Sequence, residues 1–113
     1  MIKTVAPANL DKRTVYGITH SKSFKMSDFV GTTITPTAVV ITESDDKKVA
    51  FLAVVTGENN VEVYATNSRT FIESLEEILD TFENDLSAIG GIYITSGTSR
   101  AGRPYIDCGL AVM

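Results

Sequence analysis

The alternation of hydrophobic and polar residues predicts three consecutive strands in the first half of the chain. The segment 34–42 is rich in β-branched residues, and the segment 49–56 is almost continuously apolar, as in a strand covered on both faces. In the segment 61–66 apolar and polar side chains alternate, so Tyr64 is expected to point away from Val63. The polar stretches ESDDKK and GENN separate these segments. We therefore expect antiparallel neighbours joined by short turns.

The second half of the chain predicts one helix followed by two strands. Apolar residues recur at spacings of three and four along the segment 70–86, and a pair of glycines follows it. Thr70 and Glu73 stand three positions apart at its start, which is the spacing of a capping box. Two more strands are expected at 92–96 and 104–112, joined by the glycine-containing turn GTSRAGR.

The order of these elements predicts a mainly β fold with one helix. Five strands, with the helix between the third and the fourth, match a five-stranded Greek-key barrel of the OB type. An α+β sandwich with the helix on one sheet face is the competing architecture. Residues 1–22 have no convincing periodicity, so they are expected to form an irregular N-terminal arm before a barrel domain at 23–113.

The distribution of charge separates one acidic element from a mildly basic remainder. The chain of 113 residues has 14 acidic and 10 basic residues, giving a net charge of −4. Six of the acids and none of the bases lie in the segment 70–86, so the rest has eight acids and ten bases. A protein that binds a polyanion needs a local basic surface, which the net charge does not report. The sequence is therefore compatible with a nucleic-acid ligand.

Composition and motifs argue against several other classes. No apolar run approaches the roughly 20 residues of a membrane helix, and no signal peptide is evident, so we expect a cytoplasmic protein without membrane contact. Cys108 and His20 could formally make a nucleophile pair, but Cys108 alternates with apolar neighbours and reads as a small core residue. No ligand spacing suggests a metal site. We expect no enzymatic activity, no cofactor and no metal.

Basic residues stand beside aromatic ones at three places, which is the combination that single-strand binders use. In an OB barrel the first and last hairpin loops flank the binding face, and both loops here contain cations. Each member also has a plain structural reading: Lys47 and Lys48 suit a solvated turn beside Asp45, and Phe24 suits a core. The candidate nucleic-acid-binding residues are Lys22, Lys25, Phe51, Tyr64, Arg69, Arg100, Arg103 and Tyr105.

Two strings of the sequence resemble the small single-stranded DNA-binding proteins of tailed bacteriophages. These are VYATNSRTF before the acidic helix and IYITSGTSRAGRPYIDCGL after it, and the likeness covers about residues 34–110. The resemblance implies an OB-fold protein that coats single-stranded DNA during phage replication or recombination in an infected bacterial host. The positions to which it points are Tyr64, Thr66, Asn67, Ser68, Arg100, Arg103 and Tyr105. Asn67 and Ser68 also suit the turn before any helix.

The leading hypothesis is therefore a sequence-independent single-stranded DNA-binding protein. Its expected partners are the DNA, other phage replication or recombination proteins, and further copies of itself in a homodimer or larger assembly. Val112 and Met113 are candidates for such a self-interface. The alternative is a protein–protein adaptor on the same barrel, because a fold does not determine a function.

Overall fold

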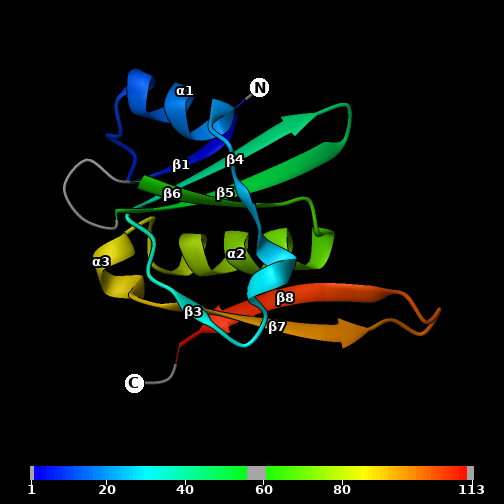
Figure 1. The fold of residues 1–113 in the computed structure, drawn as a ribbon. Coiled ribbons are helices and arrows are strands. Elements are labelled where there is room, and N and C mark those ends of the chain that lie inside the picture. The colour runs from blue at the N-terminus through cyan, green and yellow to red at the C-terminus, as the bar shows by residue number, and fades with distance from the viewer. Residues whose placement is uncertain (1, 56–60, 112–113) are drawn as a thin grey trace.

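The structure is a computed structural model that describes residues 2–55 and 61–111 (Figure 1). The predicted turn GENN and the candidate interface residues Val112 and Met113 therefore lie outside the described residues. The elements in chain order are β1 (Ile2–Ala6), α1 (Lys12–His20), β2 (Phe24–Lys25), the 3-10 helix η1 (Met26–Phe29), β3 (Thr33–Ile34), β4 (Ala38–Ser44), β5 (Lys47–Val55), β6 (Val61–Thr66), α2 (Arg69–Thr81), α3 (Leu86–Ile89), β7 (Ile92–Thr98) and β8 (Pro104–Leu110).

The described strands form two sheets on either side of α2. The larger sheet has the strand order β1-β4-β5-β6-β2, and the smaller one has the order β3-β7-β8. In Figure 1, α1 covers one face of the larger sheet, and α2 runs between its other face and the smaller sheet. The hairpins β4–β5 and β7–β8 project toward the same side of the molecule in this view.

The expected meander is present as β4, β5 and β6, which pair antiparallel in sequence order. Asp45 and Asp46 connect β4 to β5, and both have positive φ values, of 51° and 64°. Two central residues in the left-handed region define the type I′ turn, whose twist matches that of the flanking strands. Val63 and Tyr64 lie on opposite faces, as the alternation predicts, because they pack against different apolar clusters.

The strand predicted over 34–42 is interrupted, and its two parts belong to different sheets. Residues 33–34 pair with β7, whereas 38–44 pair with β5. Pro36 lies at the break, since proline has no N–H to donate to a ladder. Pairing with β5 resumes at the next residue, where the Thr37 N–H donates to the Ala53 carbonyl oxygen at 2.7 Å. One bent segment thus links the two sheets.

The closed five-stranded barrel is not what the described residues form, and they include three α-helices rather than one. Closure would require β6 to pair with the smaller sheet. Instead, β6 pairs with β5 along one edge and with the short parallel strand β2 along the other. The N-terminal segment therefore occupies the edge that a closed barrel would need.

The prediction of an irregular arm over residues 1–22 is wrong for its described part. β1 is an edge strand paired with β4, and α1 begins at the N-cap Asp11, whose carboxylate accepts the Thr14 N–H at 2.7 Å. Ile18 buries α1 against the larger sheet. Such a short helix with an internal glycine is marginal alone and depends on this packing. The local sequence pattern was therefore too weak to predict it.

The acidic helix differs from its prediction at both ends. α2 begins after the N-cap Ser68, whose Oγ accepts the Phe71 N–H at 3.5 Å, so the expected capping box of Thr70 and Glu73 is not formed. The helix ends at Thr81, and a turn follows in which Glu83 and Asn84 have positive φ. The short helix α3 then leads to β7.

Two apolar clusters hold the fold together. The larger lies between the two sheets and includes the buried face of α2, and Met26 from η1 is fully buried in it. The smaller lies between α1 and the opposite face of the larger sheet. Met26 thus packs η1 onto the main core, and the segment from β2 to β3 connects the edge of the larger sheet with the smaller sheet.

Candidate nucleic-acid interface

The β7–β8 hairpin holds two predicted arginines on an ordered loop. The Ser99 N–H donates to the Arg103 carbonyl oxygen at 2.9 Å, and the Gly102 N–H donates to the Ser99 carbonyl oxygen at 2.9 Å. Arg100 is therefore a central residue of a hydrogen-bonded turn, and the positive φ of Gly102, 79°, completes the loop. Arg100 and Arg103 are exposed and form no ion pair with any described residue. A fixed loop reduces the entropy lost on binding.

Tyr105 lies on the same hairpin, with its ring directly over Gly97. The register pairs Gly97 with Tyr105, and a Cβ added to Gly97 would lie 2.6 Å from both Cζ and Oη of the tyrosine. Only a glycine allows this approach. The ring remains 37% exposed. The ring thus packs over Gly97, and part of Tyr105 stays accessible to solvent.

Tyr93 is a second exposed ring on this face that the sequence reasoning missed. Residues opposite each other in an antiparallel pair share a face, and Tyr93 stands opposite Gly109 on the same side as Tyr105. Its side chain is 40% exposed. Parity along β7 could have identified it, since Ile92 and Ile94 are buried on the other face. The hairpin thus combines two arginines with two open rings.

A second group of predicted residues gathers at β2. Lys22 and Lys25 are exposed and lack ion pairs within the described part of the chain, and Phe24 between them is 49% exposed. The Phe24 ring lies 5.5 Å from that of Tyr64 and 6.0 Å from that of Phe29, measured between centroids. These rings support each other, which leaves Phe24 as the exposed member. Residues 22–25 are called the β2 patch below.

Tyr64 is a supporting ring more than an open platform. It is half-buried against the main core, and its hydroxyl donates to the Glu62 carboxylate at 2.7 Å. That hydrogen bond, together with partial burial, raises the pKa of Tyr64. Two acids reduce the positive potential of the β2 patch. Asp28 in η1 is exposed and follows the patch in sequence, and Glu62 belongs to β6, the strand that pairs with β2.

Phe51 does not join either group. The register pairs Leu52 with Tyr64, so Phe51 points to the opposite face of the larger sheet. There it packs against the smaller apolar cluster, together with Val15 of α1. The structure therefore places Phe51 under α1 and away from the ring of Tyr64.

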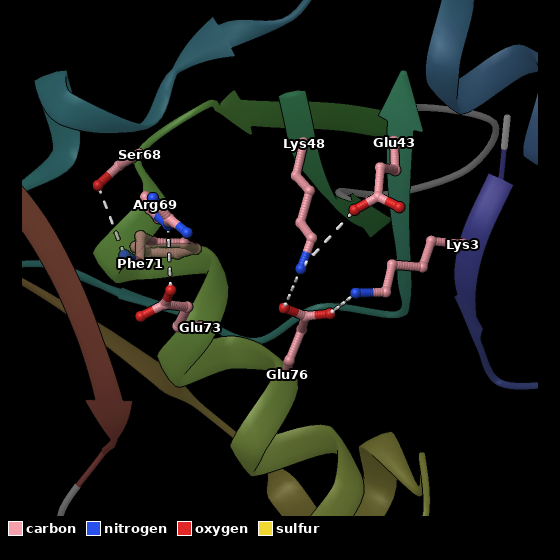
Figure 2. A network of polar contacts seen from close by, with 8 residues as sticks. All are labelled: Lys3, Glu43, Lys48, Ser68, Arg69, Phe71, Glu73 and Glu76. Carbon is pink, nitrogen blue, oxygen red and sulfur yellow. Dashed lines mark hydrogen bonds and ion pairs between the residues drawn. The ribbon is translucent and has the colours of Figure 1, made fainter. Parts of the chain in front are cut away.

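One acid of α2, Glu76, is paired with two lysines of the larger sheet. Figure 2 shows Glu76 between Lys3 of β1 and Lys48 of β5, with N–O distances of 2.9 and 3.1 Å, and Glu43 4.0 Å from Lys48. Partial burial raises the pKa of Glu76, but the hydrogen bonds from the two lysines outweigh this effect, so its pKa is lowered. In this network Lys3 and Lys48 are ion-paired within the protein, and α2 is joined to the larger sheet.

Arg69, a predicted contact residue, is also paired with an acid. Its Nε lies 3.3 Å from Oε1 of Glu73 one turn later, although its side chain is 92% exposed (Figure 2). The groove between the β4–β5 turn and the start of α2 contains this pair and is lined by three basic and three acidic side chains. Its net charge is zero, which gives a polyanion no advantage there. Ser68 nearby is used structurally, because its Oγ donates to the Ile106 carbonyl oxygen at 3.0 Å.

Cys108 lies where the sequence pattern indicates a core residue. Its thiol contacts the Phe71 carbonyl oxygen at 3.6 Å, and burial, together with the charge of Asp107, raises the pKa of the thiol to about 12. His20, the other half of the formal nucleophile pair, stacks on Tyr16 in α1. In residues 2–55 and 61–111, no three His, Cys, Asp or Glu side chains are grouped so as to hold a metal ion.

No helix within the described ranges is long and apolar enough to cross a membrane. Comparisons with protein-family models, with curated proteins and with solved structures give no match to this chain.

Proposed function

We propose that this protein binds single-stranded DNA without sequence preference. One observation carries the proposal: four exposed cations that lack acidic partners among the described residues, Lys22, Lys25, Arg100 and Arg103, share the β2 patch and the β7–β8 hairpin with half-exposed rings. Two of the four acids of α2, Glu73 and Glu76, are paired with Arg69 and with Lys3 and Lys48. The likeness of two sequence strings to phage single-stranded DNA-binding proteins favours DNA as the polymer and phage replication or recombination as the setting.

The topology supports a distant OB-type relationship as part of this proposal. In an OB barrel one bent strand pairs with a neighbour at each end, and the segment 33–44 pairs with β7 and then with β5. The helix α2 follows the third strand of the meander, and a hairpin follows the helix.

In the proposed mechanism, basic side chains bind the phosphates and planar groups stack on the bases. Lys22, Lys25, Arg100 and Arg103 contact phosphates, and arginine adds a planar surface on which a base can stack. Tyr105 and Phe24 each offer one open ring face to an unstacked base. Every base has a π face, so stacking of this kind does not select a sequence.

Fluorescence anisotropy with labelled oligo-dT tests the proposal. Each phosphate contact on a single strand contributes about −0.7 to the slope of log K against log salt. Four contacts therefore predict a slope near −2.8, which is about a 50-fold loss of affinity from roughly 50 to 200 mM salt. The double variant Arg100→Ala/Arg103→Ala should lower the affinity and reduce the slope by about 1.4.

Arg69→Ala is the matched control, because it removes an equally exposed arginine that is already paired with Glu73. We expect its affinity to stay within about twofold of the unmodified protein. Absence of binding at low salt, or binding that is insensitive to salt, contradicts the proposal. Undiminished binding by the hairpin variant would instead favour the adaptor hypothesis for these arginines.

A further inference from the structure

The solvent-exposed face of α1 carries a set of side chains that do not hold the fold together. With 3.6 residues per turn, Arg13, Tyr16 and His20 fall within an arc of about 60°, almost opposite Ile18, which buries the helix on the sheet. All three are exposed, and Tyr16 is 64% exposed. Lys12 flanks them at the start of the helix. These four residues are called the α1 stripe.

The two rings of the α1 stripe are held in a fixed stack. Tyr16 and His20 lie 3.9 Å apart between ring centroids, with planes inclined by 18°. The Nδ1 atom of His20 donates to the Tyr16 carbonyl oxygen at 2.9 Å, since a carbonyl oxygen can only accept. A large aromatic ring this exposed contributes little to packing, because its burial is what stabilises a fold.

The two cations of the stripe, Lys12 and Arg13, form no ion pair with a described residue, and the acid of the helix, Asp11, is its N-cap. Its carboxylate is occupied by the Thr14 N–H, whose hydrogen bond lowers the pKa of Asp11 and keeps it at the helix start. Cations beside a stacked pair of rings complement a polymer with phosphates and planar bases.

The stripe is continuous in the chain with the β2 patch. Lys22 and Phe24 follow His20 by two and four positions. Figure 1 shows the chain leaving α1 and descending across the larger sheet to η1, which passes in front of α2. A strand bound at the β2 patch could therefore continue along α1 without crossing α2, whose Glu76 is paired with Lys3 of β1 and Lys48 of β5.

We propose that the α1 stripe is a second contact site for the same single-stranded nucleic acid, extending the path from the β2 patch and enlarging the number of nucleotides bound. This inference rests on the proposed function. The apolar face of α1 is docked on the larger sheet, so the helix has no apolar surface to insert into a lipid bilayer. The exposed rings and cations fit a strand of bases and phosphates better than a membrane.

The test compares a short with a long oligo-dT. At about 3.4 Å per stacked nucleotide, a roughly 6-mer spans about 20 Å, and a roughly 16-mer exceeds the molecule. The longest dimension of the molecule is 41 Å. Tyr16→Ala and Arg13→Ala should weaken binding of the long oligomer by about fivefold or more and leave the short one within about twofold. Alanine favours helix, so α1 should persist, which circular dichroism checks.

Tyr16→Phe is the matched control, because it keeps the ring and should retain the affinity for the long oligomer. The inference is overturned if the α1 variants bind both oligomers like the unmodified protein, or lose affinity equally for both. It is also overturned if Tyr16→Ala abolishes sedimentation with anionic phosphatidylserine vesicles and leaves DNA binding intact. Failure of the proposed function looks different, since the unmodified protein would then bind neither oligomer.

Discussion

The close approach of Tyr105 to Gly97 allows the position of a proposed stacking ring to be changed without changing the ring. In Gly97→Ala the new Cβ would lie 2.6 Å from Cζ and Oη of Tyr105. Carbon atoms in contact prefer about 3.5–4.0 Å, so the tip of the ring must move outward by roughly 1 Å. The displaced atoms are the far end of a side chain, and the backbone pairing of β7 with β8 can stay as it is.

We expect Gly97→Ala to fold normally and to bind oligo-dT more weakly. Loss of one stacked base costs about 1–3 kcal/mol, which corresponds to about a 5- to 150-fold change in affinity. Tyr105→Ala gives the full value of this loss, and Gly97→Ala should give part of it. The assay is fluorescence anisotropy at low salt, with thermal denaturation to confirm that the stability of the two variants is similar.

A double-mutant cycle completes this test. Gly97→Ala/Tyr105→Ala should bind like Tyr105→Ala alone, because no ring is left for the new methyl group to displace. If Gly97→Ala binds as tightly as the unmodified protein while Tyr105→Ala loses affinity, the position of the ring over Gly97 does not matter. Equal affinity of all three variants and the unmodified protein would refute stacking on Tyr105.

Three further predictions concern charge and burial. Glu76→Gln should lower the free energy of unfolding by roughly 1 kcal/mol at neutral pH, because two partly exposed ion pairs are lost. The folded protein lowers the pKa of Glu76 below its ordinary 4.5, so its contribution is present above that value and lost as the pH falls through the folded pKa. Urea denaturation should therefore show the difference between the two proteins at pH 7 vanish in acid, and a constant difference would contradict the ion-pair account. Cys108 should resist alkylation at pH 8 until the protein unfolds. Its pKa of about 12, against an ordinary 9.0, leaves about a thousandth of the usual fraction of thiolate at that pH. Rapid labelling of the folded protein would disprove its burial. Asp28→Asn should raise the affinity for oligo-dT about twofold at low salt, because a carboxylate roughly 8 Å from a bound phosphate would repel it by about 0.5 kcal/mol in water. Weaker binding by this variant would place the strand elsewhere.

The parts of the fold that were predictable are those fixed by local pattern. The meander β4–β5–β6 follows from alternation and from a two-residue polar turn, and α2 follows from its apolar spacing. The break at Pro36 could have been foreseen from its missing N–H, but its consequence, pairing of the two parts with different sheets, is non-local. β1 and α1 could not be predicted, because they depend on contacts with β4 and the smaller cluster.

The candidate site was predictable in its chemistry and less so in its grouping. Arg100, Arg103 and Tyr105 come from one hairpin, so sequence proximity places them together. Phe51 and Tyr64 come from neighbouring strands, and only the register reveals that they face opposite sides of the sheet. Which cations pair with acids also cannot be predicted without the fold, because the partners can be far apart in the chain. Lys48 and Glu76 are 28 positions apart.

A titration of isotope-labelled protein with oligo-dT, followed by amide chemical shifts, tests the central claim most directly. The amides of Lys22, Lys25, Arg100 and Arg103 should shift together and saturate at one concentration, while those of Glu77 and Asp80 in α2 should not move. Shifts concentrated on the acidic helix, or no shifts at low salt, would contradict binding of a single strand along the hairpin and the β2 patch.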